Sequence, residues 1–198
     1  MKTRADVVIT IADVTPPVIT PQISGTLGNN GWYRSAVTVN WTVTDPESGI
    51  VSSTGCAATN LTADTAGITL MCSASNGVGL STSVPINIKI DKTPPVISGM
   101  PSLQCSVPNH PLIQVDNVTA ADAGSGLVPH SFTVGLTKND PSSNAQPPLI
   151  VITPNGPDAF TVIKANLLAI GNGPLFSLTA TAMDQAGNST VVAVTCGH

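Results

Sequence analysis

The sequence is poor in charged side chains and in aromatic rings. Of its 198 residues, 9% are charged and 3% are aromatic, and Glu47 is the only glutamate. Helical proteins rely on Glu, Lys, Leu and Ala, whereas this chain relies on Thr, Val, Ser and Ile, which suit pleated strands. Because Gly and Pro also number 17 each, the composition predicts an all-β protein with many turns.

What is missing also excludes several partners and activities. A net charge of −4 with 7 basic residues cannot neutralise a run of phosphates, so nucleic acid is a poor partner. No apolar run approaches the roughly 20 residues that span a bilayer. The chain has no Gly-x-Ser-x-Gly elbow, no His-Glu-x-x-His motif, no cysteine–histidine nucleophile pattern and little support for paired catalytic carboxylates. We therefore expect a protein that is not an enzyme.

The cysteines indicate disulfides. The chain contains no Cys-x-x-Cys pair and no histidine at metal-ligand spacing, which disfavours a zinc site. Four cysteines allow three pairings, and two domains would favour Cys56–Cys72 and Cys105–Cys196, one bridge in each. Disulfides need an oxidising compartment, so we expect an extracellular or cell-surface location. The first residues, MKTRADVV, show no signal peptide, so one was removed or the chain is a piece of a longer protein.

One phrase occurs twice and divides the chain. Thr15 and Thr93 open two copies of TPPVI that lie 78 residues apart, about the size of a small sandwich domain. The prolines hold φ near about −65° and favour extended geometry in the residue before them. We therefore expect a stiff extended connector at each copy. The predicted divisions are an N-terminal strand over residues 1–13 and domains over 14–91 and 92–198.

Short alternating strands are expected between the connectors. In AVTVNWTVT the residues Val37, Val39, Trp41 and Val43 share one face, and GITLMCSAS and VPINIKI alternate in the same way. Turn clusters such as GNNG and DPESG separate them. The sequence predicts two tandem immunoglobulin-like β-sandwiches preceded by an extra strand, with Trp41 and a disulfide through Cys72 in the first core. Residues 139–148 are expected to form a loop. Residues 160–171 fit either a strand or a short helix, and a strand entering a turn is favoured.

Further motifs carry a resemblance. VTDPESGI (43–50) and AADAGSGL (120–127) share Asp-x-x-Ser-Gly-aliphatic, and TAMDQAGNST contains Asp-x-Ala-Gly-Asn. With the Thr-Pro-Pro phrases and NGWYRSAVTVNW, they resemble Ig-like repeats of large bacterial surface and secreted proteins, and the related hyalin-repeat class. The resemblance implies a structural or adhesive module. The first unit departs from it, because Ser75-Asn-Gly-Val-Gly stands where the second has Asp184-Gln-Ala-Gly-Asn.

The recurring aspartates have two interpretations. Asp45 and Asp122 precede Ser and Gly in turns, where a carboxylate accepts backbone N–H bonds and holds the turn. Calcium is the alternative, because aspartates also lie at the connectors, as in calcium-rigidified cell-adhesion repeats. Its candidate ligands are Asp13, Asp45, Asp91 and Asp184, with Glu47 as a further acidic group. Calcium prefers six to eight oxygens, so the small number of acidic residues favours turn-holding and no cofactor.

Two aromatic residues could bind a carbohydrate. Trp32 and Tyr33 lie in GWYR, which is expected to be a loop, and exposed rings can stack on sugars. In a chain with so few aromatic residues, covering the sandwich edge or the connector is the favoured role. Carbohydrate therefore remains the alternative.

The segment before the first connector is apolar on both faces. Aligning the two Pro-Pro phrases pairs Val8, Thr10 and Ala12 with the second connector's strand, so Val7, Ile9 and Ile11 lie on the opposite face. A lone strand needs a partner sheet. It is either the last strand of a preceding module or a docking strand, formed by Val7, Val8, Ile9 and Ile11, that adds to a neighbouring copy.

These patterns lead to two expectations for the role of the chain. The first is a non-enzymatic, extracellular structural or adhesive tandem Ig-like module of a bacterial surface or secreted protein. The alternative is a filament subunit, in which the N-terminal strand of one copy pairs with the next, because a heterologous contact need not close. The expected partner is another protein or a second copy.

Overall fold

The computed structural model describes residues 12–102, 114–138, 149–165 and 176–196. Every regular element in these ranges is a β-strand, which confirms the all-β prediction. Among the same residues, a search for helices with the length and hydropathy of a membrane span finds none. The predicted N-terminal strand lies outside the described residues except for its last two.

The chain forms two compact units. Its described residues 12–25, 36–63 and 67–88 make up the first unit, and 26–35, 64–66 and those from 89 onward make up the second. The predicted domains 14–91 and 92–198 stay a prediction, and two short segments of the first half, 26–35 and 64–66, belong to the second unit.

The first sandwich consists of a three-stranded and a four-stranded sheet. The three-stranded sheet has the order β1-β3-β5, from β1 (Val18–Ser24), β3 (Val37–Thr44) and β5 (Thr59–Leu61). The other has the order β2-β7-β6-β4, from β2 (Trp32–Tyr33), β7 (Ser81–Ile90), β6 (Thr65–Asn76) and β4 (Ile50–Thr54). Strand β2 pairs with β7 in parallel, whereas β3 is antiparallel to β1 and β5.

The core of the first sandwich lies between these sheets. Ile19 of β1 and Cys72 and Ala74 of β6 are buried together, with Trp41 of β3 packed against them. Cys72 is bonded to Cys56, with Cα atoms 4.6 Å apart, which confirms that predicted disulfide. The alternation expected for β3 is also present, since Val37 and Val39 are fully buried.

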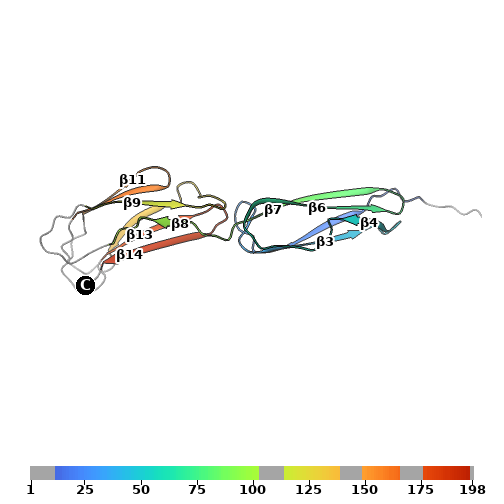
Figure 1. Ribbon diagram of the computed structural model, residues 1–198, viewed down its shortest axis with the longest axis horizontal. Coiled ribbons are helices and arrows are strands. Elements are labelled where there is room, and N and C mark those ends of the chain that lie inside the picture. Colours follow the sequence, from blue (N-terminus) through green and yellow to red (C-terminus); the bar gives the residue numbers. More distant parts are fainter. Residues whose placement is uncertain (1–11, 103–113, 139–148, 166–175, 197–198) are drawn as a thin grey trace, which may run out of the picture. The chain divides into compact units, whose positions relative to one another are not determined.

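The second sandwich also has one four-stranded and one three-stranded sheet, but here its last two strands lie in the three-stranded sheet. One sheet has the order β8-β9-β12-β11, from β8 (Val96–Ser98), β9 (Gln114–Ala121), β12 (Ala159–Ala165) and β11 (Leu149–Pro154). The other has the order β10-β13-β14, from β10 (Thr133–Lys138), β13 (Phe176–Met183) and β14 (Ser189–Cys196). Figure 1 shows β9 and β11 in one layer and β13 and β14 in the other. Lettered along the chain, these sheets are ABED and CFG, the arrangement of immunoglobulin constant-type domains.

Alternating burial explains the second core. Along β13 every second side chain is buried, beginning with Phe176 and Leu178, while the residues between them are half-buried. The core combines both sheets, and Phe132 and Phe160 meet edge to face with ring centroids 5.2 Å apart. The predicted strand from Phe160 is confirmed as β12 up to residue 165. Cys105, the rest of that predicted segment and the predicted loop 139–148 lie outside the described residues, so the Cys105–Cys196 bridge stays a prediction.

Candidate functional site

The aspartate of each connector folds back onto its own phrase. Asp13 Oδ1 accepts hydrogen bonds from Thr15 N at 2.8 Å and from Thr15 Oγ1 at 2.9 Å. Asp91 Oδ1 accepts one from Thr93 N at 3.1 Å. This is the local turn that a short acidic side chain forms with the backbone two residues later. In each copy of Asp-x-Thr-Pro-Pro the aspartate side chain thus closes a local turn just before the residues that lead into the first strand of the sandwich.

In the first sandwich, Asp13 is bound by two turns between strands. Its Oδ2 accepts bonds from Ser48 Oγ at 2.5 Å and from Asn76 Nδ2 at 2.8 Å. Asn76 Nδ2 also lies 3.0 Å from Asp45 Oδ2, and Asp45 Oδ1 accepts a bond from Ser48 N at 2.9 Å. We call Asp13, Asp45, Ser48 and Asn76 the first connector cluster. One amide group thus serves both carboxylates.

The donors of this cluster stabilise the charged carboxylates. The Ser48 hydroxyl, followed by the Thr15 backbone N–H, lowers the pKa of Asp13 below its ordinary value. The backbone N–H of Ser48 is the main cause of the lowered pKa of Asp45. Hydrogen bonds to the ionised form favour that form, which is the direction of both shifts.

In the second sandwich, three aspartates converge. Candidate ligand atoms of Asp91, Asp122 and Asp184 lie within 4.8 Å of one another, and Asp91 and Asp184 are fully buried. We call these three residues the second connector cluster. Their hydrogen-bond donors are neutral N–H groups: Thr93 N and Ser125 N for Asp91, Gly124 N and Gly126 N for Asp122, and Asn188 N and Nδ2 for Asp184. Burial, assisted by the charges of Asp91 and Asp184, raises the pKa of Asp122.

The two clusters are built on equivalent turns. Leu80 N donates to Asn76 Oδ1 at 2.8 Å, and Asn188 N donates to Asp184 Oδ1 at the same distance. Each of these turns lies between the last two strands of its sandwich. Asn76, rather than the predicted Ser75, therefore takes the position of Asp184. The alignment of Ser75 with Asp184 was therefore wrong by one residue. What the two turns share is an acidic or amide side chain three residues before a glycine, Gly79 or Gly187.

The turns that follow β3 and β9 differ at two positions, and the second of these matters for the clusters. Counted from Asp45 and Asp122, Glu47 occupies the place of Gly124. A Cβ atom on Gly124 would lie 2.4 Å from Asp91 Cγ, so only glycine leaves room for the buried carboxylate. Glu47 is exposed and has a candidate ligand atom within 4.8 Å of those of Asp13 and Asp45. The sequence predicted roles for all five aspartates of the two clusters, four as calcium candidates and Asp122 as a turn-holding residue, but it gave no role to Asn76 or Gly124.

The second connector has one more partner within the second unit. Asp64 Oδ2 accepts a hydrogen bond from Thr93 Oγ1 at 2.8 Å, and Asp64 Oδ1 lies 3.5 Å from Lys92 Nζ. Both side chains of the ion pair are partly exposed, so the pair itself contributes little, about 1 kcal/mol or less.

The aromatic pair lies at the edge of the four-stranded sheet. Trp32 is buried, with 8% of its surface exposed, and Lys89 Nζ lies 5.1 Å from the centre of its ring. An ammonium group over an aromatic face is a favourable contact, and here it covers surface that a sugar would need. Tyr33 is half-buried, and its carbonyl accepts a bond from Asp91 N at 2.9 Å. Tyr33 is thus the more accessible of the two rings.

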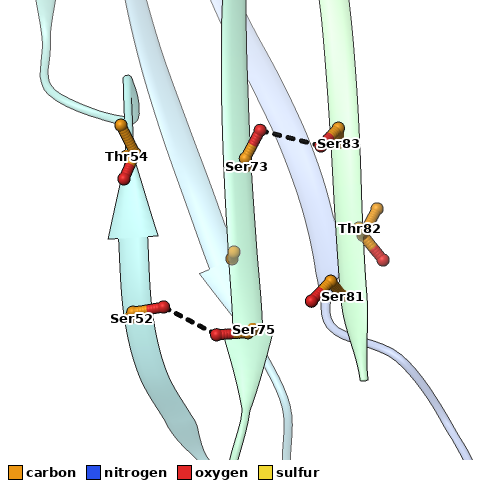
Figure 2. Close-up of a pocket in the computed structure, with 8 residues that line it drawn as sticks. Ser52, Thr54, Ser73, Ser75, Ser81, Thr82 and Ser83 are labelled. Atoms are coloured by element: carbon orange, nitrogen blue, oxygen red, sulfur yellow. Dashed lines mark hydrogen bonds between the residues drawn. The ribbon is translucent and has the colours of Figure 1, made fainter. Parts of the chain in front are cut away.

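The outer face of β4, β6 and β7 holds a shallow depression. Ser and Thr residues line it together with Ala74. Figure 2 shows two pairs of hydroxyls that point toward each other: Ser52 and Ser75 Oγ lie 2.6 Å apart, and Ser73 and Ser83 Oγ lie 2.7 Å apart. No acidic or basic side chain lines the depression, so its hydroxyls have no adjacent base that would activate a nucleophile.

Comparisons with known proteins concern the architecture. No protein-family model matches the sequence, and a search of curated proteins finds no match. Among solved structures, the extracellular domain of protocadherin GammaB4 is 15% identical, with a TM-score of 0.45, and the alignment covers 94% of this chain and 32% of that one. A titin A168169 structure is 12% identical, with a TM-score of 0.37 and coverage of 92% and 98%.

The fibronectin(III)-like modules of Clostridium thermocellum CbhA are 13% identical, with a TM-score of 0.36 and coverage of 91% and 93%. The chain spans about a third to a half of the first protocadherin structures that it matches. At these identities and TM-scores, the likeness carries no argument about function. The assignment to Ig-like sandwiches rests on the strand order and the two cores.

Proposed function

We propose that the chain is a non-enzymatic structural or adhesive module of a bacterial surface or secreted protein. The observation that carries the proposal is that each connector is bound by turns of the sandwich that follows it. Asp13 bonds to Ser48 and Asn76, and Asp91 bonds to Ser125. A connector held in this way transmits tension into a folded domain instead of extending freely, which is what a spacer between modules requires.

Two further observations support an extracellular setting. The Cys56–Cys72 disulfide persists in oxidising compartments. The Ser- and Thr-lined outer face of the first sandwich carries no charge in its depression, which fits a module that stays hydrated without attracting nucleic acid. The bacterial assignment rests on the motifs Asp-x-x-Ser-Gly and Asp-x-Ala-Gly-Asn.

A pulling experiment on the full chain tests the spacer function. With the chain tethered through both ends, we expect two separate unfolding events, one for each unit. Asp13→Ala should lower the force of one event and Asp91→Ala that of the other, whereas Asp158→Ala, outside both clusters, should change neither. Extension without resistance, or one event affected by both connector variants, would contradict the proposal.

Calcium is a second candidate, for the second connector cluster. Three carboxylates bound through both oxygens would supply six ligands, within the range that calcium prefers. The burial of Asp91 and Asp184 beside a third carboxylate favours a cation, because their donors are neutral N–H groups. In the first connector cluster, the Asn76 amide donates to both carboxylates, so the same oxygens suit a cation less well.

Calorimetric titration of the full chain with calcium chloride tests this proposal. We expect one calcium ion per chain, with binding lost in Asp184→Asn and kept in Asp45→Asn. No heat and no rise in unfolding temperature at millimolar calcium would overturn it. Equal loss of binding in both variants would also contradict the assignment to the second cluster.

Carbohydrate binding stays a prediction, and the ring available for it is Tyr33. The Tyr33→Ala variant and the parent chain should then differ in retention on a polysaccharide column. Equal retention would contradict a sugar-stacking role.

The filament alternative remains a proposal as well. Its docking strand, with Val7, Val8, Ile9 and Ile11, lies outside the described residues. What supports it is the apolar character of both faces of DVVITI and the open strand edge described next.

A further inference from the structure

The described strands include one edge without protective features. Edge strands invite pairing unless they are short, bulged or interrupted by proline or charge. Most edges of the two sandwiches carry such a device: Pro21 in β1, Pro154 in β11, a register shift in β4, Lys138 at the end of β10, and lengths of two or three residues in β2, β5 and β8. The exception is β14, which has eight residues and contains neither proline, glycine nor charge.

Strand β7, the equivalent last strand of the first sandwich, differs from β14. It contains Pro85, which has no N–H to donate, and its end pairs with β2 at Lys89 and Ile90. In the described part of the chain, β14 pairs only with β13, in an unbroken register from Phe176↔Cys196 to Met183↔Ser189. Its other edge therefore offers a regular row of backbone groups.

The turn before β14 shows which residues present those groups. Asp184 N donates to Asn188 O, so this pair bonds across the two strands. Bonded and non-bonded pairs alternate along an antiparallel ladder. Counting from Asn188, the backbone groups of Val191, Ala193 and Thr195 point to the free edge. The side chains of the same three residues are exposed.

We propose that the free edge of β14 accepts the docking strand, residues 7–12, of a second copy of this chain. This proposal deepens the filament alternative by naming the acceptor. The alternating faces of the two strands match. Val8, Thr10 and Ala12 would extend the exposed face of β14, and Val7, Ile9 and Ile11 would extend its core-facing side. On that side, Val192 and Val194 are half-buried, so additional apolar side chains would cover them.

The absence of charge also fits this occupant. Residues 7–12 and β14 both lack charged side chains, so no repulsion opposes pairing along the strands. Backbone bonds would give affinity, and the alternate side chains would set the register, as in other strand additions. Because donor and acceptor are different surfaces, the contact need not close and would produce chains of copies.

Sedimentation velocity of the full chain over a concentration series tests the proposal. We expect association that increases with concentration and that is lost in Ala193→Pro, which removes an N–H from the free edge. It should also be lost in Ile9→Pro, which interrupts the donor. The matched control is Thr137→Lys, on β10 at the opposite edge of the same sheet, which should associate like the parent.

The outcomes separate this proposal from the others. A parent chain that stays monomeric at millimolar concentration would overturn it, while leaving the pulling experiment on the spacer function unaffected. Association lost in Ala193→Pro but kept in Ile9→Pro would also overturn it, because the occupant would then be β14 of the second copy. Added peptide of residues 4–13 should dissolve the assemblies, and failure to compete would count against the docking strand. Circular dichroism confirms that each variant is folded.

Discussion

Asn76 and Asp184 occupy the same position in equivalent turns, but one is an amide and the other a carboxylate. The Asn76 amide donates to Asp13 and Asp45, at 2.8 and 3.0 Å. Asp184 instead brings a third carboxylate within 4.8 Å of Asp91 and Asp122. The carboxylates of the first cluster therefore share an amide donor, whereas the second cluster gathers three carboxylates, two of them fully buried.

Replacing Asn76 by aspartate should destabilise the first sandwich. The change removes the shared donor and places a carboxylate beside two others, so we expect a loss of about 2 kcal/mol or more at neutral pH. Native-state hydrogen exchange of β3 and β6 amides measures the effect. The matched variant is Asp184→Asn, which removes one of the three clustered carboxylates and should leave β13 and β14 at least as stable in the absence of calcium. Parent-like exchange in Asn76→Asp would contradict the assigned role of the amide.

Acid should affect the two clusters in opposite directions. The pKa values of Asp13 and Asp45 are lowered from 3.8, so their stabilisation is present above that pH and is lost as the pH falls through their folded-state pKa values. The pKa of Asp122 is raised from 3.8, so the second sandwich loses stability as the pH rises from 3.8 through the folded-state pKa of this group.

Carboxyl NMR titration measures these three pKa values directly. Asp13 and Asp45 should titrate below 3.8 and Asp122 above it. In Asp122→Asn, the loss of stability of the second sandwich with rising pH should disappear. Titration of Asp122 at or below 3.8 would show that its carboxyl is not held by burial near the other two charges.

Glycine at position 124 should be essential for the second connector cluster. A Cβ atom there would lie 2.4 Å from Asp91 Cγ, and the carboxylate is fully buried. We expect Gly124→Ala to destabilise the second sandwich by about 1–3 kcal/mol, the usual cost of overpacking. Urea unfolding followed by hydrogen exchange in β9 and β13 provides the measurement. Gly135→Ala is the control, because nothing lies within 4 Å of its Cβ position, and equal effects of both variants would refute the steric explanation.

The alternating apolar residues were sufficient to predict the strands. The faces of β3, with Val37 and Val39, and of β7, with Ile88 and Ile90, are buried as expected. The Cys56–Cys72 pairing also followed from the division into domains. Trp32 illustrates the limit of that approach: the pattern placed it in a loop, but a short parallel pairing with Lys89 makes it a buried strand residue.

The amino-acid sequence by itself determined the strand composition and the class of fold, because these depend on neighbouring residues and on alternation along the chain. Only the tertiary structure decided which side chains meet at the connectors. Asn76 lies 63 positions from Asp13, and Asn188 lies 97 from Asp91, so no local pattern relates them. They meet because the two sheets of each sandwich bring the turns of distant strands to one end. The same packing decided that the edge of β14, unlike that of β7, has no paired strand among the described residues.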